Sequence, residues 1–327
     1  MADISTVYMG MRLSSPIIVS SSGLSKNTEQ IINAAGYGAG AVVLKSLFEE
    51  QIRHEAGKAI VETANHYPEA EDYIRNYSRH NSVSEYVKLI QDVKHEVTIP
   101  VIASINCISN QEWTGFAKDL EHAGADALEL NMYLMPTDIN TKPGEIEQKY
   151  FDIVESLRTK ISIPIAIKIG SHFSNLPWFI NQMKFRGINN VVLFNRFYEP
   201  DINIDRMEMV SSSVFSKETD IRNSLRWVGL ISGMIKDIEI SASTGIHDGG
   251  AVVKQLLAGA QTVQLCSVLY KKGMKSIEVM LDELQEWMKD HNYRTLDEFR
   301  GKLSYANIAD PQTYERAQFI KYFSSLE

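Results

Sequence analysis

Cysteine is scarce in this sequence of 327 residues. Only Cys107 and Cys266 occur, and neither has a Cys or His neighbour at metal-ligand spacing. We therefore expect no disulfide and no zinc site. We interpret both cysteines as small buried apolar side chains.

Long apolar runs and clusters of basic residues are also lacking. The longest apolar stretches have the length of a strand, and the N-terminal segment has no charged region followed by an apolar one. The net charge of −8 and the missing Lys/Arg run argue against a nucleic-acid surface. We expect a cytoplasmic protein that binds neither membranes nor nucleic acid and acts on a small molecule.

Common nucleotide and nucleophile motifs do not occur either. No P-loop sequence is present, and the glycines Gly36, Gly38 and Gly40 precede a predicted strand instead of following one, so they are not a dinucleotide fingerprint. His172 and His247 lie near predicted strand ends, but no motif places a Ser or Cys nucleophile beside them. We assign both histidines solvated or capping roles.

What the sequence does contain is eight short apolar runs, each ending in a small or polar residue and each followed by a helical pattern. Their continuous apolarity is typical of parallel strands covered on both faces. The predicted strands are Pro16–Ser22, Ala41–Ser46, Pro100–Asn106, Ala127–Asn131, Pro164–Gly170, Asn190–Asn195, Ile238–Thr244 and Thr262–Ser267.

The fold class predicted from these repeated units is α/β, a (β/α)8 TIM barrel with extended loops. Helical periodicity marks Ser84–His95, Gln111–Ala123, Glu145–Lys160 and Asp248–Ala258. A doubly wound open sheet is the alternative that periodicity leaves open. We expect one domain over residues 1–327, with the barrel at about 6–290 and a helical tail, 291–327, packed outside it.

Two connections are too long for ordinary strand-to-helix turns. Leu47–Arg79 follows the second predicted strand, and Arg196–Glu218 follows the sixth. Because barrel enzymes keep their chemistry at the carboxyl ends of the strands, we interpret both connections as walls of a substrate pocket.

Polar residues recur where the predicted strands end. A single lysine could extend past a strand end to water, but Lys45 and Lys168 occupy corresponding places, which favours a shared anion or electron-rich ring. Asn106, Asn131 and Asn195 end three further strands. One such asparagine is a common turn former, whereas three at one level offer donors and acceptors for a flat heterocycle.

A phosphate site is predicted at the last two strands. Small residues let backbone amides approach a phosphate at a helix N-terminus, the usual phosphate position in these barrels. An ordinary Gly-containing turn is the alternative. The residues are Ser243, Thr244 and Gly245 before the helix at Asp248, and Cys266 and Ser267 at the next strand end.

Taken together, these motifs resemble the dihydroorotate dehydrogenase family, in its soluble class 1 branch, over Thr6–Gly273. The resemblance is carried by the segment GMRLSSPIIVSSSG at Gly10–Gly23, the Lys45-Ser46 strand end, Glu129-Leu130-Asn131, Lys168, Asn195, Thr244-Gly245-Ile246 and LAGAQTVQ at Leu257–Gln264.

The resemblance implies a homodimeric FMN enzyme that oxidises dihydroorotate to orotate in pyrimidine synthesis, with catalysis around Lys45, Asn131 and Asn195. It implies that the flavin lies against Ser21, Ser22, Gly23, Lys45, Ser46, Asn106, Lys168 and Asn195, and its phosphate against Thr244, Gly245, Cys266 and Ser267. Substrate contacts fall to Lys45, Asn65, Asn131 and Asn195.

One departure bears on the substrate. The family places a Cys or Ser base three residues after the Asn of Glu-Leu-Asn, where this chain has Leu134, and a second substrate-binding Asn where it has Pro136. Leu134 cannot accept a proton. Tyr133 and Asp138 are the nearest ionisable residues, and we expect dihydroorotate to reduce the flavin slowly or not at all.

Two other functions fit the same residues. One is a non-redox lyase or isomerase that uses Lys45 or Lys168 as a Schiff base or proton carrier and the Thr244 and Ser267 turns for a phosphorylated substrate. The other is a flavin-binding paralogue with a different substrate or no turnover.

Overall fold

The structure, a computed structural model, describes residues 2–48, 70–106 and 110–316 and contains a closed barrel of eight parallel strands. Pairing of β13 with β3 and of β4 with β6 closes the ring, which confirms the (β/α)8 barrel and excludes the open sheet. All eight predicted strands are present. They are β3 (Ile17–Val19), β4 (Ala41–Val43), β6 (Val101–Asn106), β7 (Ala127–Asn131), β8 (Ile165–Ile169), β9 (Asn190–Leu193), β12 (Glu239–Ser243) and β13 (Thr262–Leu265).

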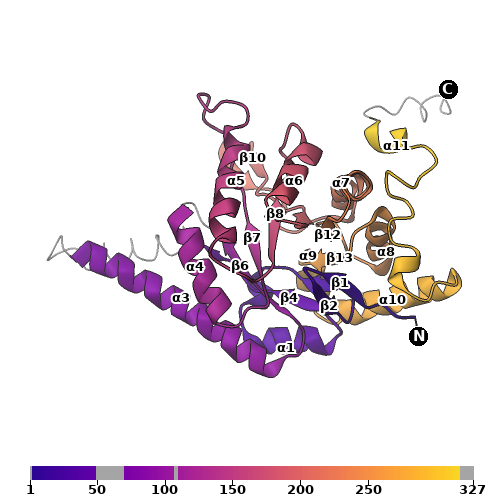
Figure 1. Cartoon of the computed structure of the whole chain (residues 1–327), viewed down its shortest axis with the longest axis horizontal. Coiled ribbons are helices and arrows are strands. Elements are labelled where there is room, and N and C mark those ends of the chain that lie inside the picture. Colours follow the sequence, from indigo (N-terminus) through magenta and orange to yellow (C-terminus); the bar gives the residue numbers. More distant parts are fainter. Residues whose placement is uncertain (1, 49–69, 107–109, 317–327) are drawn as a thin grey trace.

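Helices surround the barrel (Figure 1). Local signals define the ends of α8, because the Asp248 side chain accepts from the amide of Ala251 at its start and Gly259 adopts a left-handed conformation at its end. The helices are α1 (Thr28–Gly36), α3 (Ala70–Glu96), α4 (Asn110–His122), α5 (Glu145–Arg158), α6 (Leu176–Phe185), α7 (Ile221–Met234), α8 (Gly249–Ala258), α9 (Ser267–Lys272) and α10 (Ser276–Asp290).

Alternation along each strand separates two cores. One set of apolar side chains packs beneath the helices, and a smaller set fills the barrel interior. The antiparallel pair β1 (Thr6–Tyr8) and β2 (Met11–Leu13) adds Tyr8, Met9 and Leu13 to the interior set.

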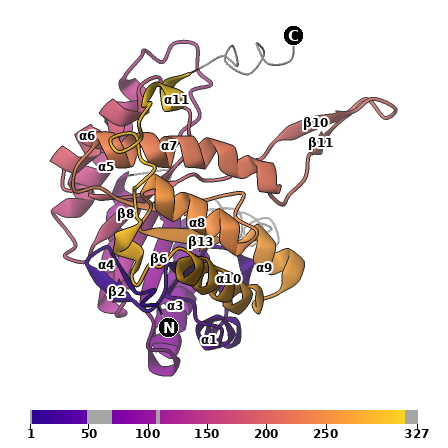
Figure 2. The same cartoon turned by 90° about the vertical axis from the view of Figure 1, so that its right-hand side faces the viewer.

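Both long connections contain structure that the sequence did not predict. Residues 70–79, expected in the first connection, belong to α3, and β5 (Leu47–Phe48) extends the sheet beside β6. The second connection carries a hairpin of β10 (Pro200–Asn203) and β11 (Glu208–Ser211), which projects from the barrel (Figure 2).

The chain after α10 contacts the barrel's outer helices. Phe299 is fully buried and packs edge-on against Trp287 of α10. Short turns, η3 (Leu296–Glu298) and α11 (Gln312–Glu315), are the helical elements of this segment among the described residues. Within the described ranges, no helix is long and apolar enough to span a membrane.

Candidate cofactor and substrate site

Lys168 lies at the carboxyl end of the barrel with only 5% of its surface exposed. Its ammonium donates to Ser20 Oγ at 2.9 Å and to Gln264 Oε1 at 2.9 Å, and it lies 3.7 Å from Glu129 Oε1. The side chain therefore does not extend to water. It is held inside the barrel mouth by partners from three other strands or strand ends.

A chain of serine hydroxyls ties the first strands together. Ser21 Oγ accepts from the amide of Ser46 at 2.9 Å, and the Ser46 hydroxyl lies 2.7 Å from that of Ser104 on β6. Tyr86 of α3 bonds both the amide and the carbonyl of Ser104. The ends of β3, β4 and β6 thus form one hydrogen-bonded rim.

The loop after β3 carries the other predicted small residues. Ser22 caps a short turn, η1 (Gly23–Ser25), by accepting from the amide of Leu24. A side chain at Gly23 would meet Tyr270 Oη at 2.7 Å, so glycine permits this close approach.

Two of the predicted asparagines bond each other. Asn195 Nδ2 donates to Asn131 Oδ1 at 2.6 Å, joining the ends of β9 and β7. Asn106 ends β6 opposite Phe48, and Lys45, which is half-buried, follows β4 with its amide bonded to the carbonyl of Ser25. Asn65 lies outside the described residues, so its predicted substrate contact remains a prediction.

The turn after β12 has a left-handed backbone at two successive residues. Thr244 and Gly245 both have positive φ, +78° and +79°, and a Cβ on Gly245 would lie 2.1 Å from the amide nitrogen of Ile221. The first turn of α7 therefore packs directly beneath this turn. Such consecutive amides can form an anion-binding concavity.

One cavity of about 390 Å³ connects these features. Its volume lies within the range of small-molecule sites. It brings together eight predicted residues, Ser21, Lys168, Asn195, Ser243, Thr244, Gly245, Cys266 and Ser267. The other predicted residues that are described, Ser22, Gly23, Lys45, Ser46, Asn106 and Asn131, are outside its lining.

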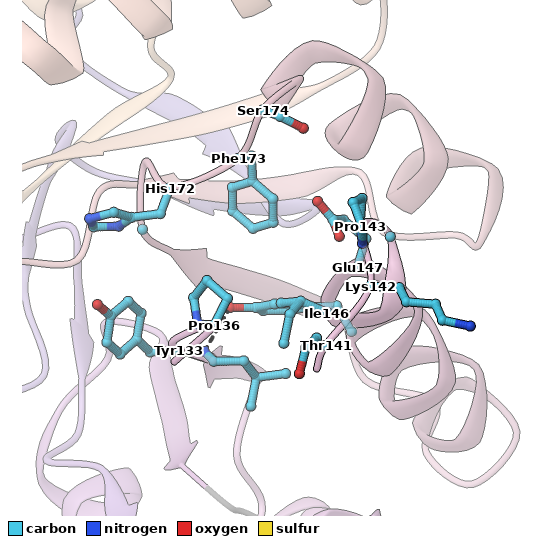
Figure 3. A pocket seen from close by; sticks show the side chains of 14 residues that line it. Tyr133, Pro136, Thr141, Lys142, Pro143, Ile146, Glu147, His172, Phe173 and Ser174 are labelled. Carbon is cyan, nitrogen blue, oxygen red and sulfur yellow. Dashed lines mark hydrogen bonds between the residues drawn. The ribbon is translucent and has the colours of Figure 1, made fainter. Parts of the chain in front are cut away.

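A second cavity of about 270 Å³ contains position 134 (Figure 3). Tyr133 lines this second cavity and Phe197 lines the first, and their rings stack with centroids 3.8 Å apart. This aromatic pair therefore joins a lining residue of one cavity to a lining residue of the other. Leu134 is half-buried, and its amide donates to Tyr150 Oη at 3.0 Å.

Neither Tyr133 nor Asp138, the two ionisable residues near position 134 in the sequence, is placed as a base. Burial raises the pKa of Tyr133, and Asp138 is exposed and accepts from its neighbour Asn140. His172, in contrast, lines the second cavity, with its ring 6.1 Å from that of Tyr133.

Two expectations drawn from the sequence are wrong. Cys266 is half-buried and lines the first cavity instead of the core, although burial raises the pKa of its thiol. His247 is neither solvated nor a cap, because it is buried and its Nε2 lies 3.0 Å from Ser216 Oγ. Cys107 lies outside the described residues.

Several lining or supporting residues were missed by sequence reasoning. Alternation could have placed Glu129 two residues before Asn131 and Gln264 two before Cys266, both on the inward face of their strands. Nothing local marks Phe197 or Arg196, whose positions depend on the loop after β9.

Comparison with known proteins supplies the family. Residues 4–288 match the family described as dihydroorotate dehydrogenase. The chain belongs to the dihydroorotate dehydrogenase family. Members are flavin-dependent dehydrogenases that act on CH–CH bonds, and this chain is an oxidoreductase of that kind.

Relatives with two kinds of name share this sequence pattern. The chain is 24% identical to the catalytic subunit of dihydroorotate dehydrogenase B (NAD(+)) of Thermoplasma acidophilum, over 92% of this chain and 99% of that protein. It is 22% identical to the NAD-dependent dihydropyrimidine dehydrogenase subunit PreA of Escherichia coli, over 97% of this chain and 80% of the relative. It is also 22% identical to the chloroplastic dihydropyrimidine dehydrogenase (NADP(+)) of Arabidopsis thaliana, over 91% of this chain and 76% of that protein.

Proposed function

We propose that this protein is an FMN-dependent oxidoreductase that acts on a CH–CH bond next to a carbonyl group. The supporting observation is the buried Lys168 ammonium, which opens onto the same cavity as the Thr244-Gly245 turn. A cation at one end and a row of backbone amides at the other match a flavin ring and its phosphate.

The cavity offers hydrogen-bond donors for both the phosphate and the ring of FMN. Ser267 and the Gly245 turn would hold the phosphate, and Lys168 would lie by the polar edge of the ring, where a cation favours the charge that reduction adds. FMN supplies a two-electron acceptor for a hydride from the substrate carbon. The bonded amides of Asn131 and Asn195, with Lys45, would orient the substrate at the mouth.

The substrate class we favour is the dihydropyrimidines, dihydroorotate among them. Oxidation of any dihydropyrimidine needs a base for the C5 proton, and Leu134 supplies none, so position 134 predicts slow turnover without choosing among these substrates. The relatives named as dihydropyrimidine dehydrogenases support this class. In such an oxidation a hydride and a proton leave adjacent carbons of the substrate.

The lyase or isomerase alternative loses support at Lys168, because its Nζ already donates to Ser20 and Gln264 and lies 3.7 Å from Glu129 Oε1. At Lys45 this alternative stays open. The alternative of a flavin-binding paralogue without turnover stays open, and an activity assay distinguishes it from an enzyme.

The test begins with the purified protein. We expect a yellow protein with one FMN per chain, identified by its absorbance and by mass spectrometry of the released cofactor. Anaerobic mixing with dihydrouracil, dihydrothymine and dihydroorotate should bleach the flavin with at least one of the three. A colourless protein that does not take up added FMN contradicts the cofactor, and a yellow protein that none of them reduces contradicts the substrate class.

A further inference from the structure

Glu129 is the most deeply buried charged residue at the site. It faces the barrel interior from β7 and has 1% of its surface exposed. Its Oε2 accepts from Gln264 Nε2 at 2.6 Å, while Gln264 Oε1 accepts from Lys168 at 2.9 Å. The amide of Gln264 therefore links the carboxylate to the ammonium with a fixed orientation.

The second carboxylate oxygen is free of hydrogen bonds. Glu129 Oε1 has no partner among the described residues and lies 3.7 Å from Lys168 Nζ, too far for a hydrogen bond. An ammonium has three N–H groups, and Ser20 and Gln264 take two of those on Lys168. The third remains for a ligand in the cavity.

Such an arrangement is a poor way to stabilise a fold. Desolvating two charges usually costs as much as their attraction returns, and apolar residues of similar size would serve as well. Apolar side chains do fill the neighbouring inward positions on other strands, at Ile18, Ala166 and Val192. The buried pair therefore indicates a role in the chemistry of the site.

We propose that Glu129 is a positioning residue that sets the reduction potential of the bound flavin. Through Gln264 it fixes where the Lys168 ammonium lies, and its negative charge offsets the attraction between that ammonium and the charge added on reduction. This proposal rests on the proposed flavin function. It assigns to Glu129 a role that the sequence motif alone does not give.

The experiment is a potential measurement on Glu129→Gln, which keeps the shape and an acceptor for Gln264 but removes the charge. Anaerobic equilibration with a reference dye should show the ratio of reduced to oxidised flavin raised at least tenfold, about 30 mV for a two-electron couple. Glu129→Asp keeps the charge but withdraws it by one methylene, and should shift the ratio in the same direction by less. This second variant decides the matter if Glu129→Gln does not fold.

Glu239→Gln is the matched control. Glu239 faces inward at the opposite end of β12, four residues and about 13 Å before Ser243 at the cavity. We expect the ratio of reduced to oxidised flavin in Glu239→Gln to stay within twofold of the ratio in the parent protein. An unchanged ratio in Glu129→Gln, or an equal shift in Glu239→Gln, would overturn the proposal while leaving flavin binding, read separately from the spectrum, intact.

Discussion

Position 134 is where the family resemblance implies the base that takes the substrate's proton. The chain has Leu134 there, and it lines the second cavity beside Tyr133, whose ring stacks on Phe197 of the first cavity. Its amide is held by Tyr150, whose pKa burial raises to about 12, so this phenol stays a hydrogen-bonding group and not a base. The side chain at position 134 can thus change without loss of the backbone contact.

We predict that Leu134→Cys accelerates flavin reduction by dihydroorotate by about 10²-fold to 10⁴-fold, the usual contribution of a positioned base. Stopped-flow absorbance under anaerobic conditions measures the rate. Leu134→Ala is the control, because it enlarges the cavity without adding a base. Equal rates for the Cys and Ala variants would mean that space, not proton transfer, limits the reaction.

At the residue scale, the sequence predicted the polar strand ends but not the residues that hold them. Lys168, Asn195 and Ser267 were found because buried runs stop at polar side chains. Glu129 and Gln264 interrupt apolar strands, and only barrel closure shows that they meet across the interior. Pairwise contacts between distant strands leave no mark in the local pattern.

Among the elements, the turn between β12 and α8 has the strictest steric requirements. We predict that Gly245→Ala lowers the free energy of unfolding by about 1–3 kcal/mol, because a positive φ is strained for a residue with a Cβ. The Cβ would also press on Ile221 at the start of α7. Gly245→Ala should also lower the affinity for FMN, which fluorescence titration measures.

A glycine elsewhere provides the comparison for that turn. Gly36 ends α1 without a positive φ, and a Cβ there would meet nothing within 4 Å. Gly36→Ala should be neutral or stabilising by up to about 1 kcal/mol. If both variants unfold at the same denaturant concentration, the turn at Gly245 is not under steric constraint.

The segment after the β10–β11 hairpin is bonded to the turns that follow β12 and β13. Ser216 bonds His247 and Ser267, and Lys271 donates to the Ser216 carbonyl. Burial, followed by the charge of Lys271, lowers the pKa of His247 below 6.5; Lys272 acts in the same direction, and Glu218 and Asp248 oppose it. The imidazole is therefore neutral when folded at neutral pH.

From this shift we predict that stability falls as the pH drops through 6.5 towards the lower pKa of folded His247, since the unfolded chain binds the proton first. Thermal melting between about pH 7 and pH 5 measures the loss. His247→Gln should flatten the curve over this range. A curve of unchanged slope in that variant would assign the pH dependence to other groups.

Elements with strong local signals were predicted, and those without them were not. The strands were found because each is a short β-branched run, and α8 because Asp248 and Gly259 mark its ends. The beginning of α3 was missed because residues 70–79 show no apolar stripe, and the β10–β11 hairpin because its strands are exposed on both faces. Periodicity reports burial, so exposed elements escape it.

For the whole molecule, the β1–β2 pair packs at one end of the barrel, and the other end opens onto the cavity that Lys168 lines. The β1–β2 pair packs Tyr8 and Leu13 into the interior, while Lys168 and the Asn131–Asn195 pair face the cavity end. A ligand that binds these groups in the folded state alone raises the free energy of unfolding. The homodimer implied by the family resemblance remains a prediction, to be measured by light scattering.

The last prediction uses this coupling between binding and stability. FMN at 100 times its dissociation constant should stabilise the fold by about 2.7 kcal/mol, and riboflavin at the same concentration by clearly less. The two ligands share the ring and differ in the phosphate, so the difference reports the Gly245 and Ser267 end of the cavity. Thermal melting of the flavin-free protein with each ligand measures both shifts. Gly245→Ala should remove most of the advantage of FMN over riboflavin, whereas Lys168→Met should weaken both ligands alike. Equal shifts for FMN and riboflavin in the parent protein would place the phosphate outside this turn.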